Sequence, residues 1–212
     1  MKDIPLFTTE YGIASLTLKE IPYTQKAYIR IQDTAHPEKF IEECLAFCRA
    51  VGAEEIYGTG HSCLGIFPTH CKILRMRGCI EDTADTGAAL FPVTEDTIEA
   101  FCKIYNEAMR DVPNAAYMSV AGGRELLAKG SGYFVHSNGK LLGIGIAQGN
   151  KIDAVASVVQ GSGKTILLTL AHALIDAAVE LEVAEENIPA MKLYKKLGFV
   201  PVEEVSVWHK IF

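Results

Sequence analysis

The chain has 212 residues, of which 49% are hydrophobic, and it carries a formal net charge of −6 at pH 7. This length holds one large domain or two small ones, and the hydrophobic content supports a buried core. The negative charge argues against a nucleic-acid-binding protein, because nucleic-acid phosphates attract clustered Lys and Arg, and an acidic protein more naturally accepts a cationic ligand.

The sequence contains no recognisable targeting or membrane segment. Its first 18 residues mix charged and turn-forming residues, without the charged-then-apolar order of a signal peptide. The longest apolar run, residues 166–174, is interrupted by Thr169 and His172 and is too short to span a bilayer. We therefore expect a cytoplasmic protein that does not associate with membranes.

The first eighty residues predict a strand, a helix and a second strand. Residues 26–33 alternate as a strand does, residues 37–51 repeat apolar side chains with helical spacing, and residues 54–57 form a short strand. The link between the first strand and the helix contains no glycine and ends in Pro37, which lacks an N–H group. A βαβ unit of unrelated origin would have the same pattern.

Six cysteines occur without a C-x-x-C pair, and we expect reduced thiols as in cytosolic proteins. These cysteines are Cys44, Cys48, Cys63, Cys71, Cys79 and Cys102. Four residues of metal-binding type are His61, Cys63, His70 and Cys71. Because the tight turns of a structural zinc site are missing around them, ordinary packing is the better interpretation and we expect no metal.

A stretch rich in Asp, Thr, Gly and Ala at residues 81–89 indicates a division of the chain. We expect one unit over residues 1–85 and a second over residues 90–212. The second unit begins with a predicted helix, residues 94–110, which has an apolar stripe and acidic residues in its first turn.

Pro113 and Asn114 end this helix. A second short helix is predicted over residues 123–129. The small residues that precede it, 120–123, indicate a mobile loop.

Three antiparallel strands are predicted next. An Asn-Gly pair at residues 138–139 separates residues 133–136 from residues 141–146, and it supplies the two positive φ angles of a tight hairpin. Gly and Asn at residues 149–150 form a second turn, and residues 152–159 form the third strand. The three strands lead directly into a glycine-rich loop.

This glycine-rich loop precedes an apolar helix, residues 165–174. A glycine loop between a strand and a helix leaves backbone N–H groups free to hold a phosphate at the helix N-terminus. The pattern therefore favours a ligand that carries phosphate. The residues expected to bind it are Val158, Val159, Gln160, Gly161, Ser162, Gly163, Lys164 and Thr165.

A nucleotide-binding P-loop is a less favoured alternative for this segment. The pattern G-x-x-x-x-G-K-[ST] requires glycine at its first position so that the backbone wraps around the phosphates, but Val158 stands there. A β-branched residue suits a continuing strand. The few elements after Thr165 are also too few to complete a nucleotide-binding sheet with its own metal carboxylate.

After the apolar helix, residues 177–184 predict a strand. Pro189 suits a first helical position and Gly198 suits a C-terminal cap, so the two residues bracket a helix. Residues 205–211 alternate as a final strand. The second unit thus has the order helix, helix, three strands, helix, strand, helix, strand.

Together, the glycine loop and the segment downstream resemble the GNAT superfamily of acyl-CoA-dependent N-acyltransferases. The pyrophosphate loop of that family is commonly written Q/R-x-x-G-x-G/A, which Gln160 and Gly163 match and from which Thr165 departs. The family's second signature is an Asn, a short helix with a Tyr, and a Gly-Phe stop. It is matched by Asn187, Ala190, Tyr194, Gly198 and Phe199.

The resemblance implies an α/β (α+β) fold with a mixed, mostly antiparallel central sheet flanked by helices. The strand, helix and strand near the N-terminus would form a smaller, partial copy of the same unit. Since this copy lacks a glycine loop, we expect it to bind no cofactor.

The resemblance also implies transfer of an acetyl group from acetyl-CoA directly to a primary amine. The strand before the loop and the strand after its helix separate, and pantetheine bonds the main chain around Val158 and Val159. A backbone N–H near Ser157 or Val158 stabilises the developing oxyanion. Asn187 and Ala190 complete the expected cofactor site, with Asn187 bonding backbone where the next helix begins.

Tyr194 is the candidate general acid, placed by the motif where the family commonly carries it, although packing alone would also explain an aromatic residue there. Asp153, on the strand before the loop, is the candidate base. Glu182 and His136 are rivals for this role. His172 is expected to be a hydrogen-bonded core residue.

The acceptor is expected to be an amine of a small molecule or peptide, bound by loops such as residues 112–123 that carry no interpretable motif. Trp208 or His209 lines the acceptor pocket or packs at a sheet edge. A catalytically weak acyl-CoA-binding or interaction protein is the alternative to an enzyme. We expect neither nucleic acid nor membrane as partner, and a homodimer is compatible with the sequence.

Overall fold

The structure is a computed structural model that describes residues 1–80, 85–174 and 178–212. These residues form two compact units, of which the first comprises Met1–Ile73 and Glu204–Phe212 and the second comprises Leu74–Glu203. From composition we placed the units at residues 1–85 and 90–212. The structure divides the chain within strands β5 (Thr69–Gly78) and β11 (Val200–Lys210) instead, and residues 81–84 lie outside the described residues.

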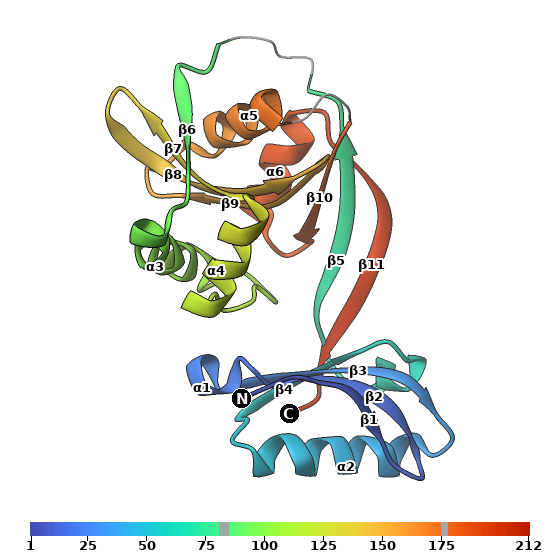
Figure 1. Ribbon diagram of the computed structural model, residues 1–212. Coiled ribbons are helices and arrows are strands. Elements are labelled where there is room, and N and C mark those ends of the chain that lie inside the picture. The colour runs from blue at the N-terminus through green and yellow to red at the C-terminus, as the bar shows by residue number, and fades with distance from the viewer. Residues whose placement is uncertain (81–84, 175–177) are drawn as a thin grey trace. The chain divides into compact units, whose positions relative to one another are not determined.

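The first unit is a sheet covered on one face by helix α2 (Figure 1). Its strands follow the order β1, β2, β3, β4, β11. Their bounds are Ile4–Thr8 for β1, Gly12–Thr17 for β2, Lys26–Thr34 for β3, Glu55–Thr59 for β4 and Val200–Lys210 for β11. Helix α2 (Pro37–Ala50) connects β3 to β4, so the strand, helix and strand predicted here are confirmed.

Two short helices, α1 (Ile21–Thr24) and η1 (Ser62–Ile66), complete the first unit. Its core consists of Phe40 and Cys44 from α2 packed against apolar strand residues such as Ile29 and Ile56. The predicted helical stripe therefore faces the sheet. The hairpin of β1 and β2 was not among the predicted elements.

The sheet of the second unit follows the order β5, β10, β9, β8, β7, β6. The bounds are Thr69–Gly78 for β5, Ala88–Pro92 for β6, Gly132–Ser137 for β7, Lys140–Gln148 for β8, Lys151–Ser157 for β9 and Val179–Ala184 for β10. Pairs β6/β7, β7/β8 and β8/β9 are antiparallel, and β9/β10 is parallel. The mixed, mostly antiparallel sheet is as predicted. Of the predicted strand 177–184, Ala177 lies outside the described residues.

Helices cover both faces of this sheet (Figure 1). On one face, α5 (Gly163–Leu174) and α6 (Ile188–Lys196) pack on β5, β7, β9 and β10. On the other face, α3 (Ile98–Met109), preceded by η2 (Glu95–Thr97), and α4 (Val120–Lys129) pack on β8 and β9. The second unit is thus an α/β/α sandwich.

The two predicted turns are confirmed by their backbone angles. Asn138 and Gly139 have φ angles of 50° and 73°, which the tight hairpin between β7 and β8 requires. Gly149, between β8 and β9, has a φ of 60°. Local turn chemistry therefore sets the connections of the strands that precede the glycine loop.

Two local predictions are wrong. The small residues 120–123 are the first turn of α4 and not a loop, because Ser119 caps this helix by accepting a hydrogen bond from the Gly122 N–H at 3.2 Å. His172 is exposed and not a core residue, because the buried positions of α5 are residues 166–171.

All six cysteines are free thiols. Burial raises the pKa of Cys44 to about 12 and that of Cys48 to about 11, so both remain protonated. Within the described part of the chain, no group of three or more His, Cys, Asp or Glu side chains is arranged to hold a metal ion. No helix among the described residues is long and apolar enough to cross a membrane.

Candidate functional site

The candidate site lies where two parallel strands of the second unit separate. β9 and β10 pair only at Lys151↔Glu180 and Ile152↔Leu181. Beyond these two pairs, both strands continue, to Ser157 and to Ala184, without further pairing between their described residues. Unpaired strand edges present N–H and C=O groups to a ligand. The separation expected from the sequence is therefore present.

A β-bulge in β9 marks the point of separation. Ile146 pairs with Ala154, but Ala147 pairs with Ile152, so Asp153 is an extra residue in β9. The bulge also changes the face of the sheet to which alternate side chains point. Ile152 packs in the core with α5 and α6, whereas Ala154, two residues later, packs in the core with α3. Asp153 is thus the first β9 residue beyond the last pair with β10.

The end of β9 is tied back to β8. The N–H groups of Val158 and Val159 both donate to the Leu142 carbonyl, at 2.8 and 3.1 Å. Neither N–H is therefore open to a ligand, in contrast to the expected main-chain contact at these two residues. Since successive N–H groups of a strand point to opposite edges, the Ser157 N–H points toward the unpaired edge of β9.

The glycine loop ends at the start of helix α5. The Ser162 hydroxyl donates to the carbonyls of Val159 and Leu142, at 2.7 and 3.0 Å, and the Ser162 carbonyl accepts the first intrahelical bond, from Ile166 N–H. The hydroxyl is thus directed at the loop and not at the first turn of α5. The N–H groups of that turn have no intrahelical acceptor. They belong to Gly163, Lys164 and Thr165.

Glycine residues permit this geometry at two positions. Gly161 has a φ of +85°, which a residue with a side chain rarely adopts. A Cβ atom added at Gly163 would lie 3.3 Å from Leu193 Cδ2 and 3.4 Å from Ser157 Oγ. The start of α5, the end of β9 and helix α6 therefore meet closely at this point. Gln160, before them, is exposed.

Exposed apolar side chains surround the same region. Val158 is 53% exposed, Val159 is 43% exposed, and Ile188, the first residue of α6, is 52% exposed. Apolar side chains left in contact with water at the end of a strand and the start of a helix are available to an apolar ligand segment. At the end of β9, the side chains of Val158 and Val159 are thus open to a ligand, although their N–H groups are bonded to Leu142.

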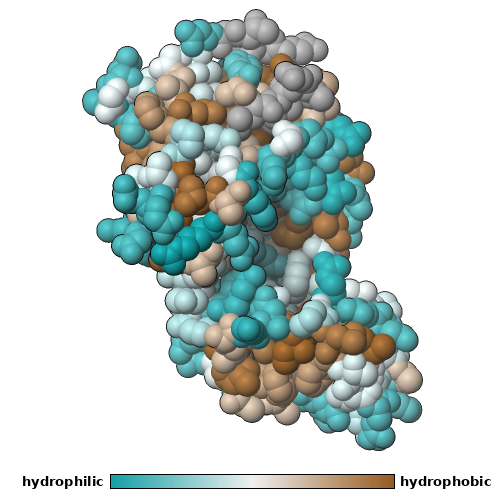
Figure 2. Space-filling model, in the orientation of Figure 1, coloured by the Kyte–Doolittle hydropathy of each residue, from teal (hydrophilic) through white to brown (hydrophobic). Residues whose placement is uncertain are grey.

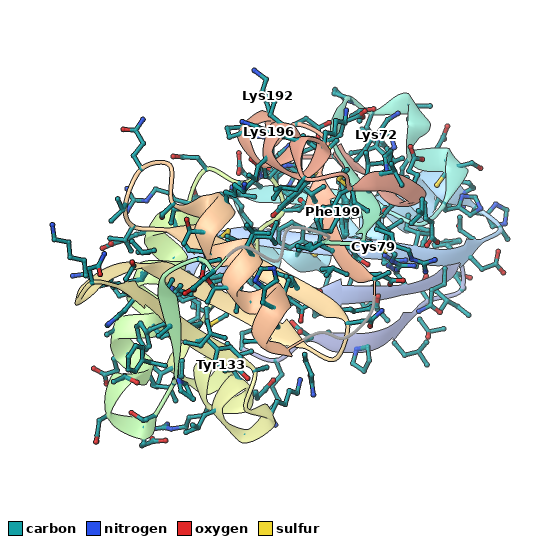
Figure 3. The ribbon with its side chains drawn as sticks, turned by 90° about the horizontal axis from the view of Figure 1, so that it is seen from above. Lys72, Cys79, Tyr133, Lys192, Lys196 and Phe199 are labelled. Carbon is teal, nitrogen blue, oxygen red and sulfur yellow. The ribbon has the colours of Figure 1, made fainter. Side chains whose placement is uncertain are left out.

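Helix α6 has the predicted residues at both ends, but it begins at Ile188, one residue before Pro189. Asn187 caps it by accepting a hydrogen bond from the Ala190 N–H at 3.3 Å, and Gly198, which follows the C-cap residue, has a φ of +85°. Pro189 lies at the second helical position and not at the first. In Figure 3, Lys192 and Lys196 project outward from α6, whereas Phe199 lies on its inner side.

Tyr194 is a buried residue of α6 with only 9% exposure. Its ring lies 5.9 Å from that of Phe199, between ring centres, within the core formed by α5 and α6. Burial raises the pKa of Tyr194 to about 12, because the ionised phenolate loses its hydration. The hydroxyl therefore stays protonated at neutral pH and is available as a proton donor.

The three candidate bases have different surroundings. Asp153 is exposed, and its carboxylate forms no hydrogen bond or ion pair with any of the described residues. Glu182 is paired with Arg75 Nη2 at 3.0 Å. His136 lies against the ring of Phe91, with 5.0 Å between ring centres. Of the three, only Asp153 carries a free carboxylate at the separation of β9 and β10.

Trp208 and His209 both belong to the first unit. Trp208 Nε1 donates to Ser206 Oγ at 3.0 Å, and its ring meets that of Tyr28 edge to face. His209 Nδ1 is 3.1 Å from the Phe67 carbonyl. Both are half-buried, and their role in an acceptor pocket stays a prediction.

A charged cavity beside the strand separation was missed from the sequence. It contains Arg75, on β5, together with Glu180 and Glu182, on β10. The Glu-x-Glu and Arg-x-Arg spacings, with Arg77 as the second arginine, place like charges on one face of each strand. This spacing was the available signal, but β5 was not recognised as a strand.

Comparison with known proteins identifies the architecture. No protein-family model and no curated protein matches the sequence. Among solved structures, the chain is similar to a GCN5-related N-acetyltransferase from Sphaerobacter thermophilus, with 12% identity, a TM-score of 0.57, and coverage of 93% of this chain and 75% of that one.

Two further solved structures have the same fold. A protein of Pyrococcus horikoshii described as an acetyltransferase shares 15% identity at a TM-score of 0.65, over 95% of this chain and 69% of that one. A tandem GNAT protein from the clavulanic acid biosynthesis pathway shares 13% identity at a TM-score of 0.51, over 94% and 79%. The chain therefore has the GNAT acetyltransferase fold.

Proposed function

We propose that the protein is an acetyl-CoA-dependent N-acetyltransferase that acetylates a primary amine directly. The observation that carries this proposal is the separation of β9 and β10 immediately before the glycine loop and the start of α5. A slot between two strands and a phosphate-binding helix start are the two features that an extended, phosphate-bearing cofactor needs. Both occur on one strand-loop-helix segment.

The helix start fits the pyrophosphate of the cofactor. The first-turn N–H groups of α5 point out of the helix end without an intrahelical acceptor, and the helix dipole favours an anion there. Since the Ser162 hydroxyl is bonded to loop carbonyls, it does not compete for these donors. Gly161 and Gly163 allow the close approach of a phosphate to the backbone.

The slot fits the pantetheine arm. At about 3.3 Å per residue, the stretch of β9 from Asp153 to Val158 is roughly 16 Å long. Pantetheine would lie along this edge as an added strand, bonded to backbone groups such as the Ser157 N–H. Its apolar part would contact Val158, Val159 and Ile188. Bound acetyl-CoA supplies the thioester from which the acetyl group is taken.

The side chains at the slot have complementary proton roles. Asp153 takes a proton from the attacking amine, directly or through one water, and Tyr194 gives a proton to the departing sulfur. The raised pKa of Tyr194 keeps its proton in place until a thiolate forms.

Several residues would support the site without touching the reacting atoms. Asn187 caps α6 and holds Tyr194 in its buried position, and Ala190 donates the N–H of that cap. Lys164, in the first turn of α5, adds positive charge beside the phosphates. The free thiols agree with a cytoplasmic enzyme.

A thermal-shift comparison of acetyl-CoA, CoA and ATP with magnesium tests the proposal. A ligand at one hundred times its Kd stabilises the folded protein by about 2.7 kcal/mol. We expect acetyl-CoA and CoA to raise Tm and ATP to leave it unchanged; the reverse result would point to a nucleotide-binding P-loop. Release of free thiol on addition of amines then tests catalysis. Binding without thiol release on any amine would indicate an acyl-CoA-binding protein without turnover.

A further inference from the structure

The charged cavity is about 220 Å³ in volume and lies within the second unit. Its lining consists of Arg75, Lys151, Asp153, Glu180, Leu181 and Glu182. These residues come from β5, β9 and β10 at the level where β9 and β10 make their last pair. Drug-sized ligands occupy roughly 300–1,000 Å³, so this cavity suits a smaller molecule.

Most charges around the cavity are already paired across strands. Arg75 binds Glu182 through Nη2, at 3.0 Å, and Glu203 through Nη1. Arg77 Nε donates to Glu180 at 3.0 Å, and this bond lowers the pKa of Glu180. Figure 2 shows hydrophilic side chains gathered on the side of the second unit where Figure 1 places β5 and β11.

Three charged groups of the lining lack a matching partner among the described residues. The Nε atom of Arg75 is buried and has no hydrogen-bond acceptor. The Asp153 carboxylate makes no ion pair, and the Lys151 ammonium makes no direct one, although its charge helps to lower the pKa of Glu180. A buried guanidinium N–H without an acceptor costs free energy unless a ligand satisfies it. Beside the paired carboxylates of Glu180 and Glu182, the cavity thus offers the Asp153 carboxylate, the Arg75 Nε–H and the Lys151 ammonium to a ligand.

We infer that this cavity binds the acceptor of the acetyl group, and that the acceptor is a small zwitterion with an amine and a carboxylate, such as a free amino acid. The inference rests on the proposed function for the presence of an acceptor. The amine of the ligand binds Asp153, and its carboxylate accepts from Arg75 Nε and Lys151.

The position of Asp153 would place the amine of the acceptor next to the reacting end of the cofactor. Asp153 is the extra residue of the bulge, and the unpaired slot for the cofactor begins there. An amine held at Asp153 therefore lies at the closed end of the slot, where the proposed pantetheine arm ends. Lys151, two residues earlier, projects on the paired side of the bulge and holds the carboxylate away from the slot.

The charge balance separates this acceptor from two others. A polyamine would leave the Arg75 Nε without an acceptor and would add positive charge beside Arg75 and Lys151. A neutral amine would satisfy Asp153 alone. Only a ligand with both charges gives the buried Arg75 Nε an acceptor and Asp153 a cation.

Acceptor specificity of the wild-type enzyme and of Lys151→Met tests the inference. An amino acid and its carboxamide differ only in the charged carboxylate, and a charged hydrogen bond contributes about 1.5–3 kcal/mol, or roughly 10- to 100-fold in kcat/KM. We expect the wild type to prefer the amino acid by this factor and Lys151→Met to lose most of the preference by a higher KM. Lys140→Met, on the exposed β7–β8 hairpin, is the matched control and should keep it.

Direct titration separates failure of the inference from failure of the proposed function. If acetyl-CoA raises Tm but amino acids are no better acceptors than their carboxamides or a polyamine, the inference is overturned and the acetyltransferase stands. If acetyl-CoA does not bind, calorimetry with the amino acids alone still decides: binding weakened by Lys151→Met and Asp153→Asn supports the cavity. Absent or unaltered binding shows that the charges only join the strands.

Discussion

β3 and β4 of the first unit are joined by five parallel residue pairs, from Lys26↔Glu55 to Arg30↔Thr59, whereas β9 and β10 of the second unit are joined by two. In both units a helix connects the two strands, so the order of elements is the same. In the first unit, continuous pairing uses the backbone groups that face each other. In the second unit, the bulge at Asp153 ends the pairing and leaves these groups for a ligand.

The two connecting helices, α2 and α5, also differ in the N–H groups at their first residues. Helix α2 begins with Pro37, which has no N–H group, and no glycine lies between β3 and this helix. Helix α5 begins with Gly163 after the left-handed Gly161, and the Gly163 N–H, which Pro37 lacks at the start of α2, has no intrahelical acceptor. The two units thus share a strand-helix-strand order but differ in strand pairing and in the start of the connecting helix, the two features on which the proposed cofactor site depends.

The largest expected effect concerns two buried tyrosines, one in each unit. Burial is the largest cause that raises the pKa of both Tyr57, in the first unit, and Tyr194, in the second, to about 12. The Tyr57 hydroxyl also donates to Glu55 Oε2 at 3.0 Å. If Tyr194 is the general acid, Tyr194→Phe should lower kcat by about 100-fold or more and leave the Kd for acetyl-CoA unchanged. Steady-state kinetics and calorimetry measure the two quantities.

Tyr57→Phe is the matched control, since it removes a hydroxyl of similar pKa from the unit without a slot. We expect its kcat to equal that of the wild type. An equal loss of kcat in both variants would mean that loss of folding, and not of a proton donor, explains the effect. A Tyr194→Phe enzyme with full activity would remove Tyr194 from the mechanism.

The substitution Gly163→Pro gives α5 the same first residue as α2. Gly163→Pro removes one N–H at the first helical position, where proline is tolerated, as Pro37 is in α2. One charge-assisted hydrogen bond is worth about 1.5–3 kcal/mol, so the Kd for acetyl-CoA should rise about tenfold or more. Gly163→Ala keeps the N–H and places its Cβ at 3.3 Å from Leu193 Cδ2, a tight contact.

The alanine variant is therefore the control, and its Kd should rise less than that of the proline variant. Calorimetric titration with acetyl-CoA, together with a melting curve of each free protein, measures both effects. Equal affinities for the two variants would show that this N–H does not hold the phosphate.

Amide exchange tests the difference in strand pairing directly. The N–H of Ser157 points toward the unpaired edge of β9, whereas β3 is paired on both sides. We expect the Ser157 amide to exchange with solvent faster than amides in the middle of β3 and to slow by about tenfold when acetyl-CoA binds, as newly bonded amides do. Slow exchange in the free protein would mean that β9 and β10 are closed in solution.

Much of the second unit could be predicted because its signals are local. The Asn-Gly turn, the glycine loop and the segment from Asn187 to Phe199 each depend on a few adjacent residues, and the structure has the corresponding hairpin, helix start and capped helix. The first turn of α4 was misjudged because its stability comes partly from packing. A Cβ at Gly123 would lie 2.8 Å from Cys102 Sγ, so a small residue there allows α3 and α4 to pack closely.

Long-range pairing accounts for what could not be predicted. β5 was missed because its polar residues, including Arg75, find their partners more than one hundred positions away, on β10 and β11. The bulge at Asp153 has no sequence signal, since only the register with β8 reveals the extra residue. The charged cavity was therefore not predicted as a whole, although the spacing of its charged residues was a signal and its residue Asp153 was predicted as a base.

The smallest expected effect concerns acid stability, in which the first unit depends on Glu55. Its carboxylate accepts from Lys210 Nζ at 2.6 Å and from the Tyr57 hydroxyl at 3.0 Å, and these bonds, with Lys26, lower its pKa to about 2. A lowered folded-state pKa stabilises the fold above the ordinary value of 4.5, and this stability is lost as pH falls from 4.5 toward about 2.

Because Glu55 is partly exposed, solvent screening limits its contribution to below about 1 kcal/mol. Glu55→Gln should therefore lower the free energy of unfolding slightly at pH 7 and have no effect near pH 2, whereas Glu42→Gln, at an exposed position of α2, should have none at either pH. Urea unfolding followed by Trp208, the single tryptophan, which lies in the first unit, measures this effect. An equal loss at both pH values would mean that Glu55 acts through packing and not through its charge.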